Sequence, residues 1–273
     1  MQQVTKNVSV ECNFRGCNPG FVTTSEGVVM IDTPQQPSDA VKWRDTIAEK
    51  GNVRYLINTE PHGDHITGNG FFPTATVIAH QGTKERFIIA PLEQMKERMR
   101  QTDPDSVRFL DDYKPHPPTI TFTDRLTLEV GDHTFHLIHL PGQTASEVAV
   151  YIPEERLAFT GDNIFYKVQV FLQEADPFDW LESLKKITEL DVDILVPGHG
   201  EVCDKSYIPE MASFIQEWID AVRGAIRQGL SKEEALAKIS FLDRYPMGQG
   251  LEAMGPGLQR MNVSNLYDRL SKQ

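Results

Sequence analysis

Four side chains that can bind a metal ion lie within six residues of the stretch N-T-E-P-H-G-D-H (residues 58–65): Glu60, His62, Asp64 and His65. Apolar residues 53–57 precede them with the length and composition of a strand, and the turn-prone segment 66–70 follows. We therefore expect these side chains on a loop at the end of a buried strand, where α/β folds commonly place their chemistry.

The spacing of the four side chains predicts which of them point the same way. In an extended or looped segment, alternate side chains share one face, so Glu60, His62 and Asp64 could converge while His65 turns the other way, toward a second metal ion. A helical H-E-x-x-H site would need its histidines four residues apart, which these are not. The alternative is a polar loop with two solvated histidines, and the matching ligands elsewhere in the chain disfavour it.

The pattern E-x-H-x-D-H resembles the H-x-H-x-D-H signature of the metallo-β-lactamase superfamily, with Glu60 at the position of the first histidine. Three later segments resemble other motifs of that superfamily, in the expected order. They are L-P-G-Q-T (140–144), which resembles P-G-H-T with Gln143 for the histidine, T-G-D-N (160–163), which resembles the G-D element, and V-P-G-H-G (196–200), which resembles P-G-H-G. The resemblance spans roughly residues 8–205.

The resemblance implies two divalent metal ions held by seven side chains: Glu60, His62 and Gln143 at a first site, Asp64, His65 and His199 at a second, and Asp162 bridging both. Two alternatives stay open at Gln143. The amide could hydrogen-bond a ligand instead of binding metal, or His139, four residues earlier, could be the ligand. Zn²⁺ is the expected metal, and the oxygen ligands of the first site make Mn²⁺ or Fe²⁺ possible there.

The function implied by the resemblance is hydrolysis. Two metal ions about 3.5–4 Å apart can share a hydroxide made from water, and that hydroxide attacks an electrophilic carbon. Asp64 can take or give the proton. The expected substrate is a small molecule of the thioester, lactone, amide or β-lactam, or isothiocyanate type. A non-haem iron redox protein, as among persulfide dioxygenases, and a degenerate metal-binding protein without activity are the alternatives.

Bulk properties exclude several partners. The net charge of −12 argues against nucleic acid and against an anionic membrane surface. Neither a signal-peptide core at the start nor a membrane-spanning run is visible, so we expect a cytoplasmic protein. The three cysteines, Cys12, Cys17 and Cys203, cannot all pair with one another. Cys203 follows His199 by four residues, so its thiol could lie near the metals or be buried and inert.

Alternating strand and helix patterns predict an α/β or α+β fold, and the resemblance implies a four-layer αββα sandwich. Strands are predicted at residues 8–14, 21–24, 28–32, 53–57, 76–79, 120–122, 126–130, 135–140, 148–152, 156–160 and 192–196. Helices are predicted at residues 38–50, 81–100 with a break at Pro91, 176–190, 207–227, from Ser231, and at 263–270, with loops at 102–118 and 243–261.

Four parts of the chain are expected to shape the site around the metals. Asp32, at the end of a strand, could hydrogen-bond a metal ligand or cap its neighbours. The charged helix of residues 92–100 is either a mobile flap or an amphipathic surface helix, and residues 163–173, with Tyr166 and Lys167, could contact substrate. Residues 1–205 form the predicted αββα domain. Residues 206–273 form a helical extension packed on it, which could also join two subunits.

Overall fold

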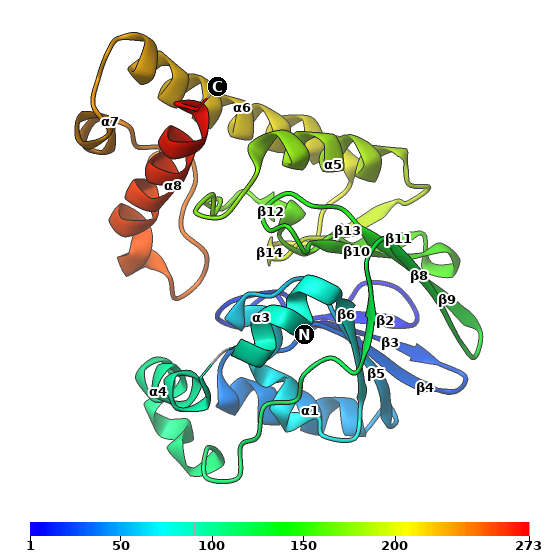
Figure 1. Ribbon diagram of the computed structural model, residues 1–273. Helices are drawn as coiled ribbons and strands as arrows, with labels where there is room; N and C mark the ends of the chain where they lie inside the picture. The colour runs from blue at the N-terminus through cyan, green and yellow to red at the C-terminus, as the bar shows by residue number, and fades with distance from the viewer. Residues whose placement is uncertain (90, 273) are drawn as a thin grey trace.

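The computed structural model describes residues 1–89 and 91–272 and consists of two mixed sheets packed face to face, with helices on both outer surfaces (Figure 1). This is the predicted four-layer αββα sandwich. Residues 90 and 273 belong to the predicted helix 81–100 and to the predicted extension, and they lie outside the described residues. No helix of the described residues has the length and apolar character needed to cross a membrane.

The strands and helices are numbered in the order in which they occur along the chain. The first sheet contains β1 (Gln2–Gln3), β2 (Val8–Val10), β3 (Gly20–Thr24), β4 (Gly27–Ile31), β5 (Val53–Asn58), β6 (Thr76–His80) and β7 (Ile120–Phe122). The second contains β8 (Arg125–Val130), β9 (His133–His139), β10 (Val148–Ile152), β11 (Leu157–Phe159) and β13 (Ile194–Val196), and β12 (Phe165–Tyr166) pairs with β14 (His199–Gly200). The α-helices are α1 (Pro37–Ala48), α2 (Gly63–Ile66), α3 (Gln81–Ile89), α4 (Leu92–Thr102), α5 (Pro177–Glu189), α6 (Ile208–Arg227), α7 (Lys232–Lys238) and α8 (Gly255–Leu270).

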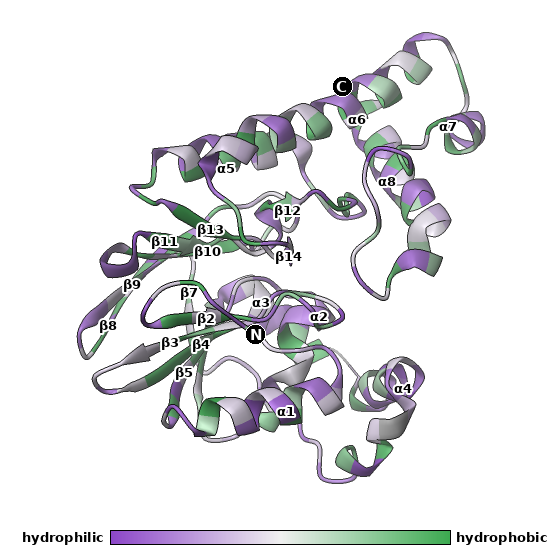
Figure 2. Ribbon diagram, turned by 180° about the vertical axis from the view of Figure 1, so that it is seen from behind, coloured by the Kyte–Doolittle hydropathy of each residue, from purple (hydrophilic) through white to green (hydrophobic). Residues whose placement is uncertain are grey.

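The first sheet is buried on both faces, which explains the near-continuous apolar sequence of its central strands. In β4, Val29 and Ile31 point into the core between the two sheets, whereas Val28 and Met30 point outward and pack against α1 around Trp43. This alternation is the period of two that a strand imposes. Hydrophobic residues accordingly gather on the strands of both sheets, shown in green in Figure 2.

The second sheet is covered by helices in the same way. Val148 and Val150 of β10 face the core between the sheets, while Ala149 faces the cluster formed with α5 and α6. The apolar stripe of α6 is buried as its sequence period predicts, with Trp218 at its centre. Figure 1 shows α5 and α6 above this sheet and α1 below the first one.

Two stretches predicted as loop contain helices. A 3-10 helix occupies Pro104–Phe109, and α8 begins at Gly255, eight residues before the predicted start at Val263. The glycines and prolines of residues 243–261 favour a loop when the sequence is read alone. Proline is nevertheless compatible with the first turn of a helix, because its missing N–H has no intrahelical partner there. The break at Pro91, between α3 and α4, is confirmed.

The longer α8 holds the loop between β12 and α5 in place. The Asn262 side chain donates to the carbonyl of Val170 (2.8 Å) and accepts from the N–H of Leu172 (2.7 Å), so it completes two buried backbone groups. Gln259 donates to the side chain of Gln169 at 3.0 Å. The C-terminal helices therefore fix a loop that lies more than 80 residues earlier in the chain. The predicted boundary between the αββα domain (1–205) and the helical extension (206–273) stays a prediction.

Replacing Asn262 with Leu tests this arrangement. Leucine has a similar size but leaves two buried backbone groups unpaired, so we expect unfolding free energy to fall by about 1–3 kcal/mol. Amide hydrogen exchange should quicken in residues 168–175, while exchange in β10 changes only through the lower global stability. Met261→Leu, at an exposed neighbouring position, is the matched control. Equal loop protection in both variants would contradict the positioning role of α8.

Candidate metal centre

Six of the seven predicted ligands come from three chain segments that end at one edge of the sandwich, and Gln143 comes from a fourth. Glu60 and His62 follow β5, and Asp64 and His65 lie in the short helix α2. Asp162 follows β11 in the 3-10 turn Gly161–Asn163, and His199 opens β14. The two later segments meet closely, because a Cβ atom at Gly198 would lie 2.0 Å from Oδ1 of Asp162. Glycine is therefore required at residue 198.

The local conformation differs from the extended loop that the alternation argument assumed. Residues 63–66 form a helical turn with His62 at its N-cap, so alternation does not decide which side chains meet. Glu60 lies between two histidines: Oε2 is 2.9 Å from Nδ1 of His62, and Oε1 is 3.1 Å from Nε2 of His65. The prediction that His65 turns away from Glu60 is wrong for this reason.

Asp162 occupies the middle of the cluster. Its Oδ1 atom is 3.2 Å from Nε2 of His65 and 3.3 Å from Nε2 of His199. The same nitrogen of His199 lies 3.2 Å from Oδ2 of Asp64. Two compact groups of potential ligand atoms result, and they share His65: Asp64, His65 and His199, and Glu60, His65 and Asp162.

Several of these atoms are buried without a hydrogen-bond partner among the described residues. They are both carboxylate oxygens of Glu60, Nε2 of His65, Oδ1 of Asp162 and both amide atoms of Gln143. Buried polar atoms are almost always paired, because an unpaired one costs about 1–3 kcal/mol or more. Converging oxygen and nitrogen atoms of this kind fit divalent cations, and Gln143 lines the same cavity as His62 and Asp64, of about 150 Å³.

The pKa shifts of the candidate ligands also fit a site that binds cations. Burial opposes protonation of His199, but the carboxylates of Asp162 and Asp64 outweigh it and raise its pKa to about 10. Burial raises the pKa of Asp64, but His65 and His199 outweigh it and lower that pKa to about 2. Burial raises the pKa of Glu60. Without a metal, protonated histidines thus balance the carboxylates, and metal ions would take over that role by displacing the protons.

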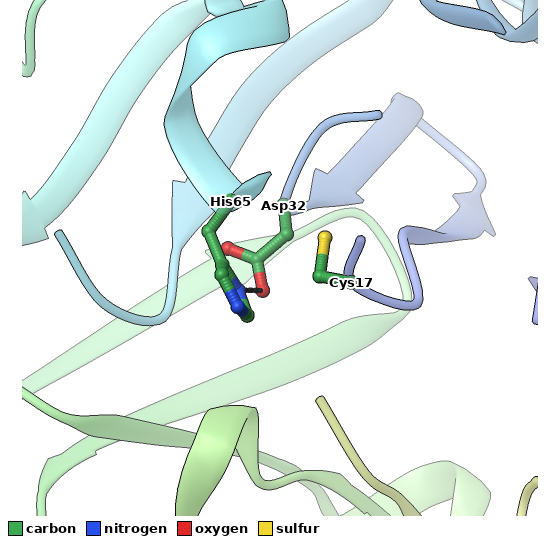
Figure 3. Close-up of side chains that lie close together, drawn as sticks. All are labelled: Cys17, Asp32 and His65. Carbon is green, nitrogen blue, oxygen red and sulfur yellow. Dashed lines mark hydrogen bonds and ion pairs between the residues drawn. The ribbon is translucent and has the colours of Figure 1, made fainter. Parts of the chain in front are cut away.

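Asp32 holds His65 in its orientation, as one of the two sequence interpretations proposed. Its Oδ2 atom lies 2.9 Å from Nδ1 of His65 (Figure 3). This leaves Nε2 of His65 within 3.1 Å of Glu60 and 3.2 Å of Asp162. The Asp32 carboxylate also accepts two hydrogen bonds from Thr59. The N–H of Thr59 donates to Oδ1 at 2.8 Å, and its hydroxyl donates to Oδ2 at 2.6 Å. Asp32 adopts a left-handed backbone conformation (φ 55°), which aspartate tolerates better than most residues.

Cys17 lies beside Asp32 and His65 in Figure 3, and its thiol supports the site by contacting the backbone of the neighbouring segment. The thiol donates to the carbonyl of Asp64 at 3.0 Å. Burial raises the pKa of Cys17 to about 12, so the thiol stays protonated at neutral pH. Both oxygens of Asp32 accept hydrogen bonds, and one of them lies next to Nδ1 of His65, so we assign these three residues to orienting His65, although their atoms are close enough to hold an ion.

Sequence reasoning missed two carboxylates. Glu174 lies 3.4 Å from Nε2 of His62 and forms a two-fold ion pair with Arg86 of α3. Buried Glu147 accepts from the N–H of Asp162 at 2.8 Å, and burial together with the charges of Glu60 and Asp162 raises its pKa well above the usual range. The acidic residue at the start of an apolar strand was a readable signal for Glu147. No local signal marks Glu174.

The remaining candidates lie apart from the cluster. His139 donates from Nε2 to the carbonyl of Ala145 (2.9 Å), and its ring stacks on His80 with centroids 4.2 Å apart, so the geometry favours Gln143 as the ligand. Cys203 packs against the hydrophobic cluster beneath α5 and α6, away from the candidate ligands. Burial raises the pKa of its thiol to about 12. Tyr166 stacks edge-on against Tyr207.

Comparison with known proteins agrees with this arrangement. Residues 12–199 match the family model of the metallo-beta-lactamase superfamily. The chain is 28% identical over 252 residues to a hydroxyacylglutathione hydrolase of Brucella anthropi, covering 89% of this chain and 80% of the relative. It is 25% identical over 224 residues to the beta-lactamase-like protein 2 homolog of Caenorhabditis elegans, covering 81% and 68%.

A solved structure confirms the fold. A metallo-beta-lactamase family protein from Thermus thermophilus superposes with a TM-score of 0.71 at 18% identity, covering 99% of this chain and 95% of that chain. The layered αββα fold and the buried histidine and carboxylate clusters at one edge of its sheets are consistent with a metal site. The chain belongs to the metallo-beta-lactamase superfamily, whose members are mostly metal-dependent hydrolases.

Asp32→Asn tests how strongly the site depends on the orientation of His65. Asparagine keeps the shape and tolerates the left-handed backbone, but it removes the charge that fixes the imidazole. We expect zinc affinity to fall about 10- to 100-fold, measured by titration against a chelating indicator. Asp45→Asn, on the exposed face of α1, should leave the affinity unchanged. Equal affinity in the Asp32 variant would refute the orienting role.

Proposed function

We propose that this protein is a dinuclear metal-dependent hydrolase of small electrophilic substrates. The observation that carries the proposal is a cluster of buried atoms without hydrogen-bond partners, from Glu60, His65, Gln143 and Asp162. Gln143 and Asp162 also line one cavity, together with His62, Asp64 and His199. Two divalent ions, when bound there, would activate water and polarise the bond that is attacked.

The side chains of the chain have distinct roles in this proposal. Glu60, His62 and Gln143 would hold the first ion, and Asp64, His65 and His199 the second, with Asp162 between them. The two oxygens of Glu60 face different histidines, so this carboxylate also lies close to the second group. Asp64, whose side chain is 21% exposed, is the ligand carboxylate most open to the cavity and is suited to pass a proton to the leaving group.

The cavity restricts the substrate. With about 150 Å³ lined by Phe171 and Gln173 besides the ligands, it accommodates a single small reacting group. A relative that covers most of this chain is named a hydroxyacylglutathione hydrolase, which makes a thioester the favoured substrate type, ahead of lactones, β-lactams and isothiocyanates. The ion pair of Arg86 with Glu174 would keep His62 oriented while such a substrate enters.

The carboxylate-rich set of candidate ligands favours one second candidate function. Glu60, Asp64 and Asp162 supply oxygen ligands, which favour iron or manganese over zinc more than histidines do. A non-haem iron redox protein of the same fold would use such a set. Metal analysis combined with thioester assays under air and under anaerobic conditions separates the two: a hydrolase works without oxygen, and a dioxygenase consumes it.

Asp162→Ala tests the dinuclear site directly. Losing the carboxylate between the two histidines should lower the metal content from two equivalents to one or fewer and reduce thioester hydrolysis by at least about a thousandfold. Metal content is measured by inductively coupled plasma mass spectrometry, and circular dichroism checks the fold. Asp179→Ala, at the exposed start of α5, is the control. Two bound metals with full turnover in the Asp162 variant would refute the assignment.

Glu60→His tests the departure of this chain from the family motif. The change replaces a hard, charged oxygen ligand with a neutral imidazole nitrogen. We expect the ratio of zinc to manganese affinity to rise by about tenfold or more, measured by competition titration. Activity need not rise, because the two side chains place the ion differently. An unchanged metal preference would show that Glu60 does not bind metal.

A further inference from the structure

A second cavity, of about 140 Å³, adjoins the metal centre on the side of α4. Its walls include Pro61 and Ile66 of the metal loop and Met95 and Met99 of α4. Gly63 lines both this cavity and the one that holds the candidate ligands. The two cavities therefore adjoin at Gly63, a residue without a side chain to separate them.

The charge at this cavity is unlike that of the protein as a whole. Arg86 and Arg98 both line it, in a chain with a net charge of −12. Arg86 is already neutralised by Glu174. Arg98 forms no ion pair with any residue that the structure describes, although its neighbour Arg100 pairs with Glu97 on the same helix. The cavity thus combines apolar walls with one unpaired guanidinium.

We propose that this cavity, the Met95–Arg98 pocket, binds the non-reacting end of the substrate, which is a short apolar chain ending in a carboxylate. The inference rests on the proposed hydrolase function and names its substrate class as acyl compounds of dicarboxylic acids. Methionine side chains adapt to chains of differing shape, and a guanidinium binds a carboxylate through paired hydrogen bonds.

The dimensions of the pocket set the length of that chain. An apolar protein cavity of about 150 Å³ holds a molecule the size of benzene. A chain of about four to six carbon atoms therefore fills the pocket, and a longer one does not fit. Because the chain carries a net charge of −12, we expect an anionic substrate to gain its attraction chiefly at Arg98, and a neutral substrate of equal length lacks that contact.

This arrangement also explains the amphipathic character of α4. Met99 is buried, Met95 is half-buried and Arg98 is exposed, so one face of the helix presents apolar atoms and a charge to the same cavity. Residues 92–100 belong to a helix with a wall of the pocket on its inner face, and whether this helix moves as a flap stays a prediction.

The test compares three thioesters of one thiol, matched in length, on the zinc-loaded protein: pentanoyl (neutral), glutaryl (anionic) and 4-trimethylammoniobutanoyl (cationic). The wild type should prefer glutaryl. In Arg98→Gln, kcat/KM should fall at least about tenfold more for glutaryl than for pentanoyl, mainly through KM. In Arg98→Glu, the cationic substrate should overtake the anionic one. Arg100→Gln, paired elsewhere on α4, should keep the wild-type order.

A binding measurement makes the test independent of turnover. Hexanoate should bind the zinc-loaded wild type more tightly than hexanol, and Arg98→Gln should remove most of that difference, whereas Met95→Trp should weaken both ligands by filling the pocket. If the protein hydrolyses all three thioesters and the Arg98 variants keep the wild-type order of kcat/KM, the proposed role of the pocket is refuted. The hydrolase proposal then still stands. Absence of hydrolysis with two metals bound overturns the hydrolase proposal, and the hexanoate titration still decides the pocket.

Discussion

The burial of carboxylates at one edge of the sandwich is the constraint on which the rest of the structure depends. Asp32, Glu60, Glu147 and Asp162 are each at most 3% exposed. Ionised carboxylates in an apolar interior are costly unless positive charge or hydrogen bonds compensate them. Hydrogen bonds serve Asp32 and Glu147, but the oxygens of Glu60 lack them. The fold therefore builds a position whose negative charge needs compensation, by protonated histidines when no metal is bound and by cations when they bind.

The two sheets make this concentration of charge possible because they fix the backbone on either side of it. The first sheet supplies Asp32 and Glu60 from the ends of adjacent parallel strands, β4 and β5. The second supplies Asp162 and leads to His199 after its own parallel pair, β11 and β13. Each half has a buried carboxylate that orders its loop: Asp32 binds Thr59 and His65, and Glu147 binds the N–H of Asp162.

Sequence patterns predicted what depends on local chemistry and missed what depends on distant contacts. The motif spacings identified six candidate ligands and Gln143. Apolar patterns located the strands of both sheets except β1 (Gln2–Gln3), because each pattern is read within a few residues. The ion pair of Arg86 with Glu174 joins residues 88 positions apart, and no local pattern encodes it. The start of α8 was missed because Pro256, a breaker inside a helix, is compatible with its first turn.

The segments around the metals differ in how tightly the fold constrains them, and this separates chemistry from specificity. The ligands sit at strand ends held by both sheets, so their geometry cannot change without loss of the core. The loop of residues 168–175 is held by α8, and the outer wall of the second cavity is α4; Figures 1 and 2 both place these two helices at the same side of the molecule. Both lie outside the strand framework. Substitutions in α4 or α8 can therefore change which molecule reaches the candidate metal site while the candidate ligands keep their positions.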